Sequence, residues 1–188
     1  MTQDKTIGAT TGKSAGMIVR PATTADAPAV TVIYGEHVQR GTGSFEEKPP
    51  STADMAARMK AVLDKGFPWV VVEDGGRILA YAYAGPYHHR AAYRYTAEDS
   101  VYVADHARGR GYGKAALEAV IAGCRAMGMR RLLGVIGDSG NTASIALHRS
   151  LGFEHCGTLP SVGFKAGKWL DVVLMHLPLN GGDESPPA

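Results

Sequence analysis

The chain has 188 residues, of which 45% are hydrophobic and 20% are charged. This length and composition predict one globular domain with a sizeable core and exclude a disordered chain. Lys and Arg total 20 against 18 for Asp and Glu, a net charge of +2. We therefore expect neither a general nucleic-acid surface nor a polybasic membrane anchor.

The cysteine pattern and the polar N-terminus indicate a cytoplasmic protein. Cys124 and Cys156 lie far apart, and no CxxC pair or Cys/His spacing suits zinc. The first residues lack the apolar segment of a signal peptide. No run approaches the roughly 18 apolar residues of a membrane span. We expect a reduced compartment, no structural metal and no membrane contact.

Two polar ends frame the expected domain at 17–179. Residues 1–16 and 180–188 have the composition of flexible tails. The segment from Gly8 to Ser14 superficially matches a phosphate-binding P-loop. Its two glycines are separated by three residues rather than four, and a strand pattern follows instead of a helix. We therefore interpret this segment as tail.

The first half of the domain alternates strand and helix signals. Thr24 and Asp26 are cap-type residues before a helix whose apolar face includes Val30 and Ile33, and Ser51 caps a second helix. In chain order we expect a strand at 17–20, these two helices separated by a loop at 41–50, and a hairpin of strands at 69–73 and 77–84 around a turn at 74–76.

The second half predicts a further strand, a glycine-rich loop and the clearest helix of the chain. That helix carries Leu117, Val120 and Cys124 on one stripe and stops at Gly128. In chain order we expect a strand at 100–104, the loop at 108–113, this helix, a strand at 131–136, a helix at 141–151, and strands at 153–159 and 171–176. The sum is a mixed α/β (α+β) domain with helices on each side of a sheet.

The loop Arg108-Gly-Arg-Gly-Tyr-Gly113 is a candidate anion site. Glycines at alternate positions let the backbone approach an anion, and the first N–H groups of the following helix point at it. Arg108, Arg110 and Lys114 add positive charge, so a pyrophosphate is the expected guest. The alternative is a turn that only connects strand to helix. The spacing is not GxGxxG, which argues against a dinucleotide motif.

A second candidate segment runs from Asn141 to Phe153. Asn141 is a good helix N-cap, and His148 flanks the apolar stripe that contains Leu147. Taken alone, His148 is typical of a surface or half-buried hydrogen-bonded histidine.

Together, these two segments resemble the GNAT superfamily of N-acetyltransferases, and within it the phosphinothricin and methionine sulfone (methionine sulfoximine) group. The resemblance spans roughly 17–178. Further matching residues are Ser44-Phe45, Phe67-Pro68-Trp69, residues 82–86, 90–93 and 98–103, Leu147-His148, and Gly163-Phe164-Lys165.

The resemblance implies a GNAT fold, with a mostly antiparallel seven-stranded sheet splayed in a V and about four flanking helices. Acetyl-CoA would lie in the gap between two parallel strands, and no metal is implied. The backbone at Val101, Tyr102 and Val103 would hold the pantetheine arm, and Asn141 would contact it. The implied pyrophosphate-binding residues are Arg108, Gly109, Arg110, Gly111, Tyr112, Gly113 and Lys114.

Carried over residue by residue, the resemblance makes Glu98 and His148 the catalytic pair. Glu98 would accept the proton of the acceptor ammonium, and His148 would orient Glu98 or relay a proton. A guanidinium binds a carboxylate with two hydrogen bonds, which suits Arg90 as an acceptor ligand. The implied acceptor-binding residues are Phe45, His88, His89, Arg90 and His148. Glu98 as a plain polar strand residue and Arg90 as a solvated charge remain the alternatives.

The implied reaction is acetyl transfer from acetyl-CoA to the α-amine of a small amino-acid-like acceptor: methionine sulfone, methionine sulfoximine or phosphinothricin. Such an activity would confer resistance to an inhibitor of this type. Since no Cys or Ser nucleophile accompanies the motif, we expect direct transfer in a ternary complex. The resemblance also suggests a homodimer. The alternatives are a protein or peptide N-terminal acetyltransferase and a non-catalytic acyl-CoA sensor; a closed pocket of Phe45, Arg90 and His148 argues against the first, and intact Glu98 and His148 against the second.

Overall fold

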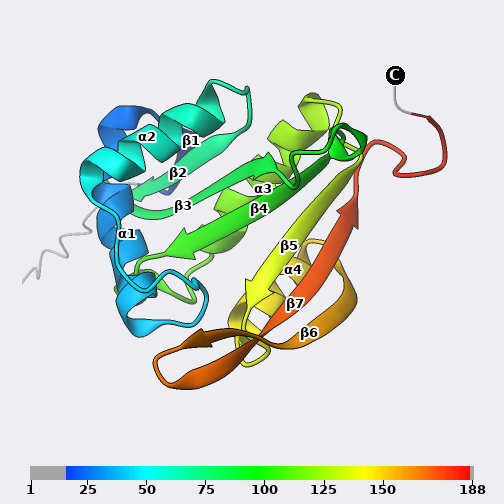
Figure 1. The fold of residues 1–188 in the computed structure, drawn as a ribbon. Coiled ribbons are helices and arrows are strands. Elements are labelled where there is room, and N and C mark those ends of the chain that lie inside the picture. Colours follow the sequence, from blue (N-terminus) through cyan, green and yellow to red (C-terminus); the bar gives the residue numbers. More distant parts are fainter. Residues whose placement is uncertain (1–15, 187–188) are drawn as a thin grey trace, which may run out of the picture.

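A sheet of seven strands organises the part of the chain that the structure describes, and its strand order is β1-β2-β3-β4-β5-β7-β6 (Figure 1). The computed structural model describes residues 16–186. Among the described strands, only β4 and β5 pair in parallel; the other neighbours are antiparallel. This confirms the mostly antiparallel sheet. The strands are β1 (Ile18–Pro21), β2 (Trp69–Asp74), β3 (Arg77–Pro86), β4 (Thr96–Val103), β5 (Arg131–Gly137), β6 (Glu154–Lys165) and β7 (Lys168–Pro178).

Helices cover both faces of this sheet, as expected. Figure 1 shows α1 (Ala27–Arg40) and α2 (Thr52–Leu63) on one face and α3 (Tyr112–Ala126) and α4 (Thr142–Ser150) on the other. The α3 stripe is fully buried against the sheet, including Leu117, Val120 and Cys124. Short 3-10 turns occupy Thr24–Asp26, Ala91–Tyr93 and Asp105–Ala107.

The capping residues of α2 and the glycines of the β2–β3 turn adopt the predicted roles. The Ser51 hydroxyl accepts a hydrogen bond from the Asp54 N–H at 3.1 Å, and the Asp54 carboxylate accepts from the Ser51 N–H at 3.1 Å. This reciprocal capping box starts α2. Gly75 and Gly76 have φ angles of +59° and +75°, so the β2–β3 turn uses the left-handed region that glycine tolerates best.

Three strands differ from the prediction. β4 begins at Thr96 rather than Ser100, and the prediction missed its first half because that half is polar and carries Glu98 and Asp99. β6 and β7 extend well beyond the expected segments and form a hairpin arm. Nearly every residue of β6 is exposed, so this strand lacks the alternation by which a half-buried strand is recognised.

The sheet opens into a V between β4 and β5. Their register covers only four pairs, from Thr96 with Arg131 to Asp99 with Gly134. β4 stays paired with β3 as far as Val103, and β5 stays paired with β7 as far as Gly137. Each strand therefore follows its outer neighbour, and the two halves of the sheet separate after Asp99.

The segment after β7 is attached to the body of the protein. Leu179 is buried, and the Asn180 side-chain amide donates to the carbonyl oxygens of Arg125 and Met129 at 2.8 and 3.1 Å. The Arg130 guanidinium donates to the carbonyl oxygens of Asn180, Gly182 and Ser185. These bonds lie within the expected tail at 180–188. Most of the other expected tail, with the Gly8 to Ser14 segment, lies outside the described residues.

Candidate active site

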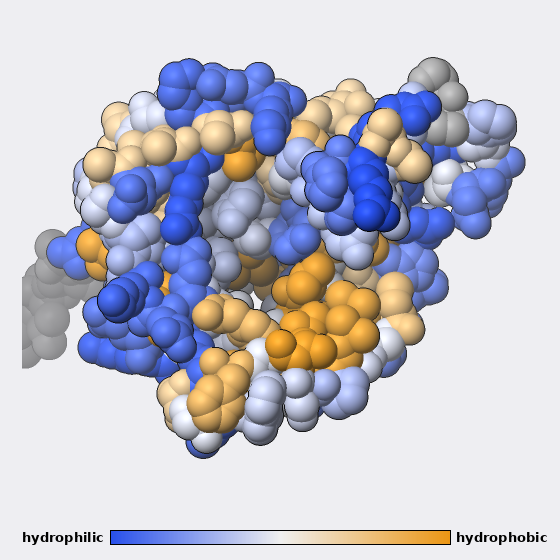
Figure 2. Space-filling model, viewed as in Figure 1, coloured by the Kyte–Doolittle hydropathy of each residue, from blue (hydrophilic) through white to orange (hydrophobic). Residues whose placement is uncertain are grey.

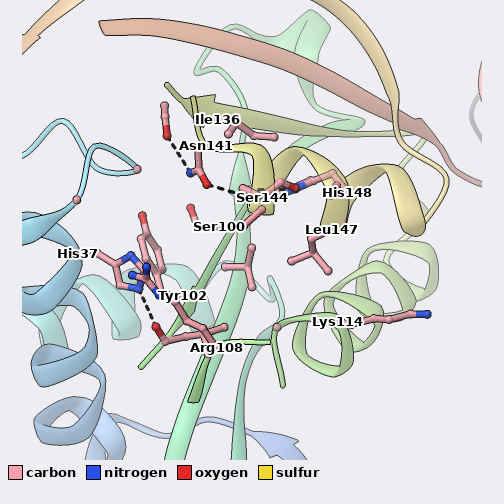
Figure 3. A pocket seen from close by; sticks show the side chains of 18 of the residues that line it. His37, Ser100, Tyr102, Arg108, Lys114, Ile136, Asn141, Ser144, Leu147 and His148 are labelled. Carbon is pink, nitrogen blue, oxygen red and sulfur yellow. Dashed lines mark hydrogen bonds between the residues drawn. The ribbon is translucent and has the colours of Figure 1, made fainter. Parts of the chain in front are cut away.

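A cavity of about 860 Å³ fills the gap between the diverging ends of β4 and β5 (Figure 3). Its walls come from five parts of the chain: the second half of β4, the end of β5, the start of α3, the length of α4, and α1 with the loop after it. The residues on these walls include most of the expected cofactor residues: Val101, Tyr102, Val103, Arg108, Gly109, Gly111, Tyr112, Gly113, Lys114 and Asn141.

One edge of β4 offers backbone groups to this cavity. The Ala104 N–H donates to the Leu79 carbonyl, toward β3, at 2.9 Å. Because backbone direction alternates along a strand, Val101 and Val103 direct their N–H and C=O groups to the opposite edge, into the gap. There the Val103 carbonyl accepts a hydrogen bond from His37 Nε2 at 2.9 Å. Burial lowers the pKa of His37, which favours the neutral ring. The edge can pair with an extended ligand as a strand would.

The glycine-rich loop turns the chain from this edge into α3. Gly109 and Gly111 have φ angles of +74° and +86°. Gly111 is the N-cap of α3 and supplies no capping side chain, so the N–H groups of the first helical turn have no intrahelical partner. A Cβ on Gly113 would lie 3.1 Å from Val103 Cγ2, which shows how closely α3 approaches β4. This arrangement fits an anion at the helix N-terminus.

The three basic side chains of the loop differ in position. Arg108 lies 2.5 Å from the Asp105 carboxylate, and Lys114 lies 3.9 Å from Glu118. Figure 3 shows the Lys114 amino group directed away from the gap. Arg110 does not line the cavity; its guanidinium lies over the Tyr112 ring, 5.1 Å from the centroid. The backbone of the loop therefore faces the gap more directly than its cationic side chains do.

Asn141 makes hydrogen bonds to both α4 and β5, which form two walls of the gap. Its side-chain oxygen accepts a hydrogen bond from the Ser144 N–H at 3.3 Å and caps α4, as the sequence predicts. Its amide nitrogen donates to the carbonyl of Gly137, the last residue of β5, at 3.0 Å. Both polar groups are thus used to hold α4 against β5.

His148 is paired with Asp99, and the structure does not bring it to Glu98. His148 Nε2 lies 3.0 Å from Asp99 Oδ1, and both side chains are buried. The ring also packs edge-on against Phe153. Consecutive residues on a strand point to opposite faces, so Glu98 and Asp99 cannot both face His148. Asp99 was not predicted from the sequence, although its period-two spacing with Val101 and Val103 was a signal for it.

Glu98 faces the other side of the sheet, with Ser100 and Tyr102. It is half-buried and does not line the cavity, whereas Ser100, two residues on, does. Burial raises the pKa of the Glu98 carboxyl, and the neighbouring charge of Asp99 raises it further. Glu98 is therefore a carboxyl that holds its proton at higher pH than an exposed glutamate.

The expected acceptor residues fall into two separate places. The Phe45 ring lies between Gly137 and Gly163, where an added Cβ would come within 2.5 and 2.3 Å of it. His88, His89 and Arg90 belong to the β3–β4 loop, where the two imidazole rings stack at 4.3 Å and Arg90 is exposed. The Phe45 ring, from the loop between α1 and α2, packs against Gly137 at the end of β5, whereas Arg90 precedes the start of β4. Since these strands are parallel, the two residues lie at opposite ends of them.

Lys165 fastens the loop that carries Phe45. Its buried Nζ donates to the carbonyl oxygens of Ser44 and Gly41 at 2.6 and 3.0 Å. Burial lowers the pKa of this amine. A hydrogen bond of 2.9 Å joins the Ser44 hydroxyl to the Tyr34 hydroxyl. The loop is thus held from the β6–β7 arm on one side and from α1 on the other.

Two features of residues 16–186 bear on metal and membrane binding. Within that range, no group of three or more His, Cys, Asp or Glu side chains is placed to hold a metal ion. No helix in the same range combines the length and the apolar character needed to cross a membrane.

Residues 33–153 match the model of the family described as the acetyltransferase (GNAT) family. The chain belongs to this family. GNAT membership accounts for the parallel β4–β5 pair, the gap beyond it and the glycine-rich loop at the start of α3. It identifies the chain as an acetyltransferase.

Two curated relatives within the GNAT family are similar to this chain over most of its length. The chain is 52% identical to the phosphinothricin N-acetyltransferase of Alcaligenes faecalis over 162 residues, which is 86% of this chain and 82% of the relative. It is 40% identical to the L-methionine sulfoximine/L-methionine sulfone acetyltransferase of Pseudomonas paraeruginosa, covering 89% of this chain and 98% of the relative.

Solved GNAT structures share the same architecture. A phosphinothricin acetyltransferase from Sinorhizobium meliloti, determined in complex with AcCoA, is 43% identical, with a TM-score of 0.88 over 92% of this chain and 93% of that one. A Brucella melitensis structure described as a ribosomal-protein-alanine N-acetyltransferase is 40% identical, with a TM-score of 0.84 over 86% of this chain and 99% of that one.

Proposed function

We propose that this GNAT enzyme transfers an acetyl group from acetyl-CoA to the α-amine of a small amino-acid-like acceptor. Methionine sulfone, methionine sulfoximine and phosphinothricin are the proposed acceptors, and the names of the relatives support this class. The observation that carries the proposal is the cavity in which the open edge of β4 leads directly to the N-terminus of α3.

The residues around the gap fit acetyl-CoA. Val101 and Val103 offer backbone groups to the amides of a pantetheine arm, and the backbone from Gly109 to Lys114 offers N–H groups to a pyrophosphate. When bound, acetyl-CoA supplies an activated acetyl thioester. A backbone N–H at Val101 is the proposed donor to the thioester oxygen as charge develops there.

Glu98 is the proposed base. It accepts a proton from the acceptor ammonium, directly or through a water, while His148 acts on the opposite face of β4. Direct transfer in a ternary complex is supported by the state of the cysteines. Cys124 is buried, and burial raises the pKa of its thiol to about 12. Cys156 is exposed on the β6–β7 arm. A buried thiol with such a pKa is a poor nucleophile.

Arg90 is the proposed ligand of the acceptor carboxylate, and it is exposed in the loop that leads into the first half of β4, where Glu98 lies. We expect Arg90→Ala to raise the acceptor KM by about tenfold to a hundredfold, as for loss of a charge-assisted hydrogen bond. Arg94→Ala, in the same loop, is the matched control. Thiol release is measured with methionine sulfone, phosphinothricin and peptides with free N-termini. Transfer to peptides but to no small amine favours a protein acceptor, and tight acetyl-CoA binding without any transfer favours a sensor.

We expect Lys165→Met to weaken acceptor binding through the loop that carries Phe45. The variant removes both hydrogen bonds to the loop carbonyls. A misplaced acceptor wall raises the acceptor KM by about tenfold, with little change in the affinity for acetyl-CoA. Lys168→Met, an exposed position on the same arm, is the control. An unchanged acceptor KM in Lys165→Met would exclude this role.

The proposed enzyme is a cytoplasmic homodimer. Figure 2 shows apolar side chains gathered over β5 and β7, where no helix covers the sheet on this face. The half-buried residues there are Leu133, Val135, Val172 and Leu174, and the nearby exposed residues of the arm are Leu159, Val162, Phe164 and Trp169. Contiguous apolar surface of this kind supports self-association. Sedimentation equilibrium measures the mass directly.

A further inference from the structure

We propose that Asp99 is a positioning residue for His148. The two side chains share one proton at the point where β4 and β5 diverge, and His148 donates this proton to the departing thiolate. This inference rests on the proposed acetyl transfer. It replaces the expected Glu98–His148 pair with an Asp99–His148 pair. Asp99 acts through His148 and is not itself placed on the reacting atoms.

The hydrogen-bond partners of His148 locate the protons. His148 Nδ1 lies 2.8 Å from the Ser144 carbonyl oxygen, which can only accept, and 3.4 Å from the Ser144 hydroxyl, which can donate or accept. The shorter contact, with the carbonyl oxygen, assigns a hydrogen to Nδ1. His148 Nε2 faces Asp99 Oδ1 at 3.0 Å. This contact needs a second hydrogen, on the nitrogen or on the oxygen. The pair therefore holds one proton more than a neutral histidine beside a carboxylate.

Burial makes that proton hard to lose. Asp99 Oδ2 is buried and has no hydrogen-bond partner among residues 16–186. Without the shared proton, a buried carboxylate would face the bare nitrogen of a neutral ring. Burial raises the pKa of Asp99, and the hydrogen bond from His148 opposes that rise only in part. Burial pushes the pKa of His148 down, but the hydrogen bond and charge of Asp99 outweigh it and hold the pKa above its ordinary value.

The groups that surround the pair come from β4, β5, α3 and α4. The titratable neighbours are Glu98 on β4 and Cys124 on α3, each of which interacts electrostatically with Asp99. From β5, Gly134 lies under the ring, where an added Cβ would be 2.8 Å from His148 Cδ2. From α4 the ring meets Ser144, and Phe153 packs against it. The Glu98 carboxylate, when ionised, holds the proton on the pair more tightly, whereas Cys124 stays a neutral thiol because its pKa is raised to about 12.

The pair sits where a proton is useful. Asp99 and Gly134 are the last residues at which β4 and β5 pair, and Asp99 and His148 both line the cavity just beyond. The acceptor ammonium loses two protons from nitrogen, one before it attacks the thioester and one as the new C–N bond becomes an amide, and Glu98 passes each in turn to solvent. The pair gives one proton to sulfur as the C–S bond breaks and takes one back from solvent, so each cycle releases one proton overall.

The first test uses the protein without acetyl-CoA or acceptor. Long-range ¹H–¹⁵N NMR spectra report the protonation of each ring nitrogen of His148 as a function of pH. We expect Nδ1 to stay protonated and the pair to titrate above the ordinary histidine value of 6.5. Since the folded pair keeps a proton that the unfolded chain has lost, the urea midpoint falls as pH rises through this titration. Titration at or below 6.5, or an unprotonated Nδ1, overturns the proposal.

The second test uses Asp99→Asn, with Asp64→Asn, at the exposed end of α2, as control. An Asn amide can donate to Nε2 of the neutral ring, so the variant keeps the contact and loses the shared proton. We expect the elevated titration to disappear. We expect kcat to fall by about tenfold to a hundredfold with an unchanged KM for acetyl-CoA, as for loss of a proton donor. We also expect the wild-type kcat to fall at high pH, where the pair loses its proton, and this fall to be absent from Asp99→Asn.

These outcomes distinguish a failure of the Asp99–His148 proposal from a failure of the proposed acetyl transfer. An unaltered kcat and pH profile in Asp99→Asn, with the titration lost, overturns the role in catalysis. If Asp99→Asn does not fold, the wild-type NMR titration still decides where the proton lies. Absence of transfer to every amine contradicts the proposed function, whatever the NMR result.

Discussion

Glu98→Gln is expected to lower kcat by about a hundredfold to ten-thousandfold, the range typical of losing a general base. The amide keeps the size of the side chain but cannot accept the proton of the acceptor ammonium. Because Glu98 lies outside the cavity wall that holds the cofactor residues, the affinity for acetyl-CoA should remain. Isothermal titration calorimetry measures the affinity for acetyl-CoA, and thiol-release assays measure kcat.

The same role of Glu98 predicts how the activity depends on pH. Glu98 acts only when it is deprotonated, and burial raises its pKa. Activity should therefore fall as pH decreases through this raised pKa, at higher pH than for an exposed glutamate. The residual activity of Glu98→Gln should lack this acid limb. Glu154→Gln, an exposed position on β6, is the control. Near wild-type kcat in Glu98→Gln would remove Glu98 from the mechanism.

Gly134→Ala is expected to destabilise the protein by about 2–4 kcal/mol, which is large for the addition of one methyl group. The new Cβ would lie 2.8 Å from His148 Cδ2 and 3.0 Å from Nε2. His148 is 2% exposed and packs against Phe153 on another side, so it cannot move away freely. A displaced ring leaves Asp99 buried without its partner.

Urea unfolding of Gly134→Ala measures this loss, and thiol release measures the accompanying loss of kcat. Gly157→Ala on β6 is the matched control, because no atom lies within 4 Å of its added Cβ. A change below about 0.5 kcal/mol in Gly134→Ala, the range of neutral surface substitutions, would contradict the tight packing of Gly134 against His148.

The elements with strong local signals were predictable from the sequence. The stripe of α3, the Ser51 cap of α2 and the Gly75-Gly76 turn each depend on residues close together in the chain. The sequence also predicted the glycine-rich loop at the start of α3. Local propensity and period decide these features, and the fold agrees with them.

The partner of His148 was not predicted because β4 begins earlier than its apolar half. Once the strand starts at Thr96, a period of two places Asp99 on the same face as Val101 and Val103, toward α3 and α4. The polar start of β4 hid this register. Taking Glu98 as the partner amounted to choosing the wrong face of the strand.

The acceptor side was the least predictable part of the site. Phe45 and Arg90 lie in loops, which have no periodicity to fix where a side chain points. The contact of Lys165 with the Ser44 carbonyl joins residues 121 positions apart in the chain. Such pairings follow from the assembled sheet and its β6–β7 arm, and no local pattern encodes them.

The most direct test of the central claim is a combined assay of thiol release and product mass. The purified protein is incubated with acetyl-CoA and methionine sulfone or phosphinothricin. We predict one free thiol for each acceptor acetylated on its α-amine, with both substrates required together before any thiol is released. Thiol release without acceptor, acetylation only of peptide N-termini, or acetyl-CoA binding with no acetylated product would contradict the account.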